Sequence, residues 1–130
     1  MTENPNIALH RRGHEAFSRG DQDTLAEIIA EDTLWHVAGR SPTSGEYVGR
    51  DAVFQFFTTL GELSDGTIGL EDQFFMGDGD RTVALFRITA SRGGERLEAD
   101  FCEVVRWENG QVAEDWGFAF DQHAYDEFWS

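Results

Sequence analysis

The hydrophobic positions near the start of the chain recur with the period of an α-helix. They predict a helix that begins at Pro5 or Asn6 and ends near Arg19, where Gly20 follows. The residues that share one face of this helix are Ile7, His10, His14 and Phe17. The two histidines on that face are spaced one helical turn apart.

Two further helices are predicted before the middle of the chain. Asp21 is a candidate N-cap for a short helix, and another helix is expected from Asp51 to about Leu63. The apolar residues of these helices are Leu25, Ile28 and Ile29 in the first, and Val53, Phe54, Phe57 and Leu60 in the second. Between them, Thr33–Val37 is a candidate strand, and the glycine- and serine-rich segment Gly39–Gly49 is expected to be a loop.

After Gly66 the pattern becomes that of β-strands, interrupted by glycine-centred turns at 77–80, 92–94 and 109–110. The runs between the turns are Thr67–Met76, Arg81–Ser91, Glu95–Trp107 and Gln111–Phe120. Long antiparallel strands twist and curl. We therefore expect an α+β fold, a cone-shaped half-barrel in which three N-terminal helices pack in a curved, mostly antiparallel sheet. One domain over residues 1–130 would enclose a pocket.

Strand alternation separates the residues that face this pocket from those that face away. Glu103 is the one charged residue on a face that otherwise carries Leu97, Ala99, Phe101, Val105 and Trp107. In the last run, Asp115 and Asp121 share a face with the small residues Gly117 and Ala119, which leave room for a ligand. The opposite face carries Trp116, Phe118 and Phe120, which suit burial against a second subunit.

The charge of the chain limits its partners. Its 130 residues include 10 basic and 25 acidic ones, a formal net charge of −15, so nucleic acids and anionic membranes would be repelled. All the basic residues are arginines, which excludes a lysine Schiff base. The single cysteine, Cys102, excludes an intramolecular disulfide. No apolar run approaches the roughly 20 residues that span a bilayer, and no signal peptide is recognisable, so we expect a cytoplasmic protein.

Two segments resemble the SnoaL-like branch of the nuclear-transport-factor-2-like superfamily. They are Trp35-His-Val-x-Gly39-x-x-Pro42-x-x-Gly45-x-Tyr47-x-Gly49-Arg-Asp51 and the closing Trp116-x-x-x-x-Asp121, within a similarity that runs from about Ile7 to Trp129. The superfamily includes ketosteroid isomerases, polyketide cyclases, limonene epoxide hydrolases and non-catalytic binding modules. The resemblance therefore implies the fold and a homodimer, and leaves the activity open.

The resemblance also implies roles for four polar residues. His36 stands where ketosteroid isomerases have their proton-shuttling aspartate, and Glu103 where they have the aspartic acid of the oxyanion hole. The oxyanion tyrosine of those enzymes would fall on or near Gly13, which does not match. Asp121 matches the aspartate that polyketide cyclases use as general acid and base. Limonene epoxide hydrolases pair such an aspartate with an arginine and a second carboxylate, of which this sequence keeps only Arg87.

Each of these residues also has a structural interpretation. His36 could be a histidine of the core. Glu103 could form an ion pair or occupy an outward-facing strand position. Asp121 could be the cap or turn residue that begins segment 121–129. His10 and His14 have a spacing that can bind a metal, but the glutamate of a His-Glu-x-x-His motif is absent and spacing fixes no third ligand. We therefore predict neither a metal nor a cofactor.

The hypothesis that joins these observations is a cofactor-independent enzyme of the cyclase or isomerase type. Asp121 or His36 would remove a proton beside a carbonyl, and Glu103 or Arg87 would stabilise the enolate. The substrate, a mostly apolar small molecule, would contact His14, Trp35, Tyr47, Phe54, Phe57, Phe101 and Asp115, and Phe74 is expected in the core or pocket wall. Two alternatives stay open: a non-catalytic binding module for a hydrophobic metabolite, and an epoxide-hydrolase-like enzyme.

Overall fold

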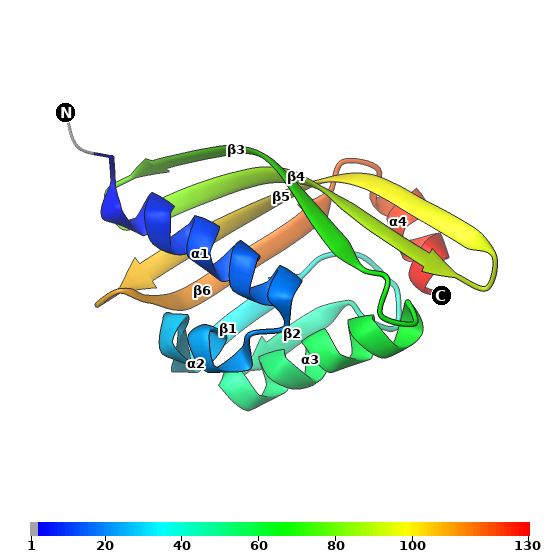
Figure 1. The fold of residues 1–130 in the computed structure, drawn as a ribbon, viewed down its shortest axis with the longest axis horizontal. Coiled ribbons are helices and arrows are strands. Elements are labelled where there is room, and N and C mark those ends of the chain that lie inside the picture. The colour runs from blue at the N-terminus through cyan, green and yellow to red at the C-terminus, as the bar shows by residue number, and fades with distance from the viewer. Residues whose placement is uncertain (1–2) are drawn as a thin grey trace.

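The computed structural model describes residues 3–130, which form four helices and six strands (Figure 1). The helices are α1 (Pro5–Arg19), α2 (Gln22–Ile28), α3 (Arg50–Leu63) and α4 (Gln122–Trp129). The strands are β1 (Ile29–Val37), β2 (Gly45–Val48), β3 (Gly69–Asp78), β4 (Arg81–Arg92), β5 (Glu95–Glu108) and β6 (Gln111–Ala119). None of the described helices is long and apolar enough to cross a membrane.

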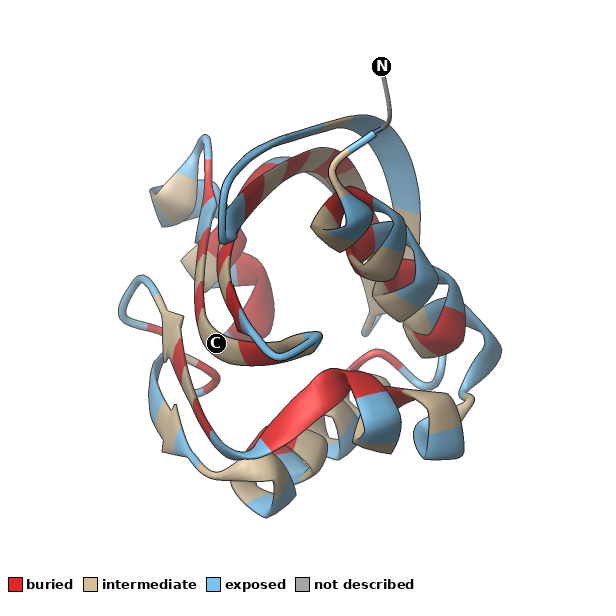
Figure 2. Cartoon of the chain, turned by 90° about the vertical axis from the view of Figure 1, so that its left-hand side faces the viewer, coloured by how far each residue is buried: buried red, intermediate tan, exposed pale blue. Residues whose placement is uncertain are grey.

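The strands form one mixed sheet in the order β2-β1-β6-β5-β4-β3. β1 runs parallel to β6, and every other neighbouring pair is antiparallel. The sheet curls without closing, and α1 and α3 border the space inside the curl (Figure 2). The predicted α+β half-barrel is confirmed, with a fourth helix at its C-terminal end.

Side-chain caps explain why the first two helices begin and end where the sequence predicts. The Asn4 side chain accepts a hydrogen bond from the backbone N–H of Asn6 at the start of α1. α1 ends at Gly20, whose φ of 67° is a left-handed conformation that glycine adopts without strain. The Asp21 carboxylate then accepts hydrogen bonds from the backbone N–H and the hydroxyl of Thr24, which caps α2.

The structure corrects three predictions of local structure. Ile29 opens β1 instead of ending the second helix. The predicted loop 39–49 contains β2, whose Tyr47 pairs with Trp35 of β1. The last strand ends at Ala119, so Asp121 no longer follows the alternation of β6. Short edge strands and strand ends depend on pairing partners far away in the chain, which local composition does not reveal.

Two apolar clusters fill the concave side of the sheet. One joins Phe86 and Phe101 to the residues of α4, and the other joins α1 and α2 to α3 and the central strands. Val53 and Leu60 of α3 are buried as predicted. The most buried aromatic of α3 is Phe56, however, while Phe54 and Phe57 are half-buried and pack at the margin of the second cluster.

Candidate functional site

A cavity of about 120 Å³ lies between α1, α3 and the concave side of the sheet. Its wall consists mainly of apolar and aromatic side chains, among them Trp35, Phe57, Phe86, Phe101, Trp107 and Tyr125. Gly117 shapes this wall because it has no side chain: a Cβ there would lie 2.9 Å from the Phe101 ring. His10, His14, Glu103 and Asp115 form the polar part of the wall.

Glu103 is the centre of this polar group. Its Oε1 atom lies 2.6 Å from His10 Nε2 and 2.8 Å from His14 Nε2. The two histidines lie on consecutive turns of α1, which is why both reach one carboxylate on β5. The second ring nitrogens also have partners: His10 Nδ1 is 2.8 Å from Thr82 Oγ1, and His14 Nδ1 is 2.7 Å from Asp72 Oδ1.

Donor and acceptor chemistry assigns the protons that face Glu103 and those of His14. Trp107 Nε1–H can only donate, so the Thr82 hydroxyl accepts from it at 2.8 Å and also lies 2.8 Å from His10 Nδ1. The Glu103 carboxylate can only accept, so His10 Nε2 donates to it. His14 has a carboxylate at each ring nitrogen, and carboxylates accept, so both of its nitrogens carry protons. Burial opposes a charge on His14, but its hydrogen bonds to Asp72 and Glu103 outweigh burial and raise its pKa to about 9.

Glu103 and Asp115 form a buried pair of carboxyl groups with opposite protonation. Burial disfavours the Glu103 charge, but hydrogen bonds from Asp115, His10 and His14 hold the pKa of Glu103 well below its ordinary value. Burial and the adjacent Glu103 charge raise the pKa of Asp115 well above its ordinary value. Asp115 is 3% exposed, and its Oδ2 has no hydrogen-bond partner among the described residues. Asp115 is therefore the neutral member of the pair, and its single proton is the one that hydrogen-bonds to Glu103.

His10, His14 and Glu103 are also the described residues that come nearest to a metal-binding set, since their ligand atoms lie within 4.8 Å of one another. The distances of 2.6 and 2.8 Å between Glu103 Oε1 and the two Nε2 atoms are those of direct hydrogen bonds. Ligands of a tetrahedral zinc ion, with bonds of about 2.0–2.1 Å, lie roughly 3.3 Å apart. A metal would have to separate the three side chains and displace two protons, so the geometry fits proton sharing better.

A family model described as a SnoaL-like domain matches residues 10–115, most of the segment that builds this site. The chain belongs to the SnoaL-like family. An uncharacterized protein of Mycobacterium tuberculosis (strain ATCC 25618 / H37Rv) is 31% identical to this SnoaL-like chain over 132 residues, which cover 100% of both.

Solved structures with the same fold include proteins of the SnoaL-like and NTF2-like groups. Bal32a, from a soil-derived mobile gene cassette, superposes with a TM-score of 0.94 at 37% identity and covers 96% of each chain. IdmH from Streptomyces antibioticus, proposed to be a polyketide cyclase, superposes with a TM-score of 0.76 at 18% identity, over 93% of this chain and 97% of that one. The second likeness is one of fold alone.

Six residues that the sequence predicts for the site of this SnoaL-like protein line the cavity. They are His14, Trp35, Phe57, Phe101, Glu103 and Asp115. Alternation along β5 and β6 turns Glu103 and Asp115 toward the concave side, and the helical period of α1 does the same for His14. The structure thus brings the predicted carboxyl groups and the histidine together, while their roles stay predictions.

His36 lies on the other face of the sheet, contrary to its predicted place in the pocket. Its neighbour Trp35 points into the cavity, and successive strand residues face opposite sides. His36 Nε2 is 2.7 Å from Glu114 and its Nδ1 is 3.2 Å from Glu46. Its ring stacks on Trp116 with the centroids 5.4 Å apart.

Arg87 and Asp121 also lie outside the cavity, and they do not pair with each other. Arg87 occupies the outer face of β4, where its Nε is 3.5 Å from Asp100 Oδ1. Asp121 is exposed and caps α4 by accepting a hydrogen bond from the Ala124 N–H. The arginine and aspartate that an epoxide-hydrolase-like site would need therefore both lie outside the cavity, and they form no ion pair with each other.

Three predicted aromatic wall residues have other positions. Tyr47 donates its hydroxyl proton to the Thr43 carbonyl at 2.7 Å and packs in the core beside the cavity. Phe54 packs in the core without being part of the cavity wall. Phe74 was expected in the core or wall but is 52% exposed on the outer side of β3.

Sequence reasoning missed two residues of the polar group and the partner of a third. His10 was singled out with His14 on one face of α1, although no local pattern pairs it with Glu103. Thr82 and Asp72 carry no local signal, since they lie 72 and 58 positions from the histidines that they contact. Only the pairing of β3, β4 and β5 brings them together.

Proposed function

We propose that this protein is a small-molecule enzyme of the cyclase or isomerase type, in which Asp115 is the general acid. The observation that carries the proposal is the Asp115 carboxyl, which is buried in the wall of an apolar cavity, keeps the proton that it shares with Glu103, and has no partner at Oδ2 among the described residues. A carbonyl oxygen of the substrate accepts a hydrogen bond from this single proton, which in the free protein is donated to Glu103. As negative charge develops on that oxygen, the hydrogen bond strengthens.

Glu103 provides the matching base in this proposal. It is ionised, it lines the same cavity and it lies next to Asp115. One carboxyl held neutral and one held charged is the arrangement that separates acid from base in a single site. The α-proton of the substrate passes to Glu103 while Asp115 gives a proton to the carbonyl oxygen, which produces a neutral enol. The reverse transfers return each carboxyl to its starting state.

The wall of the cavity also indicates the substrate class. No arginine lines it within the part of the chain that the structure describes, and both N–H groups of the His14 imidazolium are already bonded to carboxylates. A carboxylate or phosphate ligand would find no counter-charge there. The proposed substrate is therefore an uncharged, largely aromatic or alicyclic molecule with a carbonyl group.

Solvent deuterium uptake tests the proposal directly. The purified protein is incubated in D₂O with a panel of uncharged cyclic enones and aryl diketones, and deuterium at the carbon beside the carbonyl is followed by NMR. We expect exchange above the buffer rate for at least one compound, and a loss of about 10²–10³-fold in Asp115→Asn. Asp100→Asn, on the outer face of β5, is the matched control and should exchange like the wild type.

The same assay distinguishes the other assignments. If His36→Ala or Asp121→Asn lost exchange while Asp115→Asn kept it, the acid and base would be the residues outside the cavity and the proposal would be wrong. A panel compound that binds without any exchange would instead favour a non-catalytic binding module. One observation supports that second candidate: Glu103 already accepts hydrogen bonds from two histidines, which weakens it as a base.

We also propose that the protein forms a homodimer through the outer face of its sheet. On this face, one row of paired residues runs across β3, β4, β5 and β6 and consists of Phe74, Leu85, Cys102 and Phe118. A second row next to it consists of Met76, Val83, Val104 and Trp116. Phe74 and Phe118 are 52% and 42% exposed, so this apolar face suits burial against another copy.

A further inference from the structure

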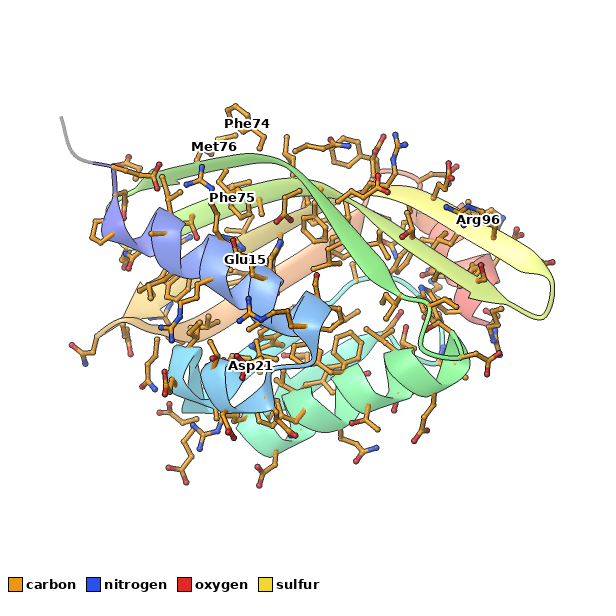
Figure 3. All side chains as sticks on the ribbon, viewed as in Figure 1. Glu15, Asp21, Phe74, Phe75, Met76 and Arg96 are labelled. Atoms are coloured by element: carbon orange, nitrogen blue, oxygen red, sulfur yellow. The ribbon has the colours of Figure 1, made fainter. Side chains whose placement is uncertain are left out.

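β3 contains a one-residue bulge that decides which of its side chains face inward. Its register against β4 shifts between Asp72 and Phe74, which makes Gln73 the extra residue. Asp72, before the bulge, lies on the concave side against His14. After the bulge Phe75 takes the inner position and Phe74 turns outward (Figure 3).

The bulge brings a carboxylate and an aromatic ring to the same imidazole. Asp72 Oδ1 is 2.7 Å from His14 Nδ1, and the Phe75 ring lies edge-on to the His14 ring with centroids 5.4 Å apart. Under strict alternation Asp72 and Phe75 would occupy opposite faces, because they are three positions apart. Asp72 is not part of the cavity wall and its side chain is 34% exposed. It therefore acts on the site through His14 and not by touching a ligand.

The ionisable groups that face His14 come from three elements. Asp72 approaches from β3, Glu103 from β5, and His10 from the preceding turn of α1, with its ring centroid 5.0 Å away. Asp115 of β6 is linked to His14 through Glu103. No arginine forms an ion pair with these carboxylates in the described chain. Two carboxylates thus face His14, and they favour its charged form.

We propose that Asp72 is a positioning residue that holds His14 as an imidazolium, so that Glu103 stays ionised and the proton of the carboxyl pair stays on Asp115. The inference rests on the proposed role of Asp115. Without the Asp72 charge, His14 loses its positive charge at lower pH. Glu103 then loses a charged donor and competes with Asp115 for the proton that the substrate needs.

Asp72→Asn tests this because the side-chain amide oxygen of the variant still accepts the His14 Nδ1 proton and only the charge is lost. The ring ¹⁵N and ¹H signals of His14 are followed by NMR from pH 5 to 10, together with the pH profile of deuterium exchange. In the wild type His14 should keep both protons up to about pH 9. In Asp72→Asn we expect its titration and the alkaline limb of exchange to move down by at least one pH unit, with KM changed less than twofold.

Glu71→Gln is the matched control, since Glu71 is exposed on the outer face of the same strand and should leave the His14 titration unchanged. An Asp72→Asn protein whose His14 titrates as in the wild type overturns the inference. So does a wild-type His14 that loses a proton below pH 7, a measurement that needs no variant to fold. If the titration shifts as expected while no compound exchanges, the role of Asp72 stands and the proposed function fails.

Discussion

The Asp115 side chain has opposite effects on the proposed function and on the stability of the fold. Its pKa in the folded protein lies well above the ordinary value, because burial and Glu103 disfavour its charge. As pH rises above about 3.9, the unfolded chain ionises this carboxyl before the folded protein does, so the group lowers the free energy of unfolding there. The carboxyl that the proposed reaction needs therefore makes the folded protein less stable.

We therefore expect Asp115→Asn to be more stable than the wild type at pH 7, because the wild-type carboxyl gains free energy by ionising when the chain unfolds. The amide keeps the shape and still donates to Glu103, but it has no proton to lose. The difference should shrink as pH falls and disappear below about pH 4. Urea unfolding of both proteins at pH 4 and pH 7 measures it. A variant that is less stable at pH 7 would contradict the assigned protonation.

The elements of the fold divide into those that local signals specify and those that they do not. α1 and α2 begin and end at residues that cap them, and the hairpin at Asn109-Gly110 follows a turn preference that needs no distant partner. β2 and the parallel pairing of β1 with β6 depend on contacts across many positions, and neither was predicted. The position of His36 was wrong for a related reason: alternation gives two faces, and only the packing of Trp35 shows which one is inside.

Asp121 shows how an assignment changes once the end of a strand is known. Its carboxylate accepts from the Ala124 N–H at 3.1 Å and so starts α4, the helix that brings Tyr125 to the cavity wall. We expect Asp121→Ala to lower the free energy of unfolding by about 1 kcal/mol, and Asp121→Asn to change it by only a few tenths, because asparagine also caps helices. Chemical denaturation of the two variants measures the difference, and equal losses would argue against a capping role.

The whole molecule presents an apolar outer face and a net charge of −15. Self-repulsion between two such chains must be outweighed by the apolar area that the dimer buries. In sedimentation velocity at micromolar concentration we expect twice the 14.7 kDa chain mass for the wild type. Phe118→Asp should sediment as a monomer, while Gln55→Asp, on an exposed position of α3, should not. A monomeric wild type would remove the case for this interface.

The extra residue in β3 has a consequence for how such sites arise. Removing the codon for Gln73 would restore unbroken alternation and still leave Asp72 and Phe75 on the same side of the strand, because they would then be two positions apart. The acidic partner of His14 can therefore survive the loss of the extra residue without any substitution at position 72. A regular pairing that kept Gln73 would instead separate the carboxylate from the ring, so a change in the length of this strand can leave the site intact while a change in its register cannot.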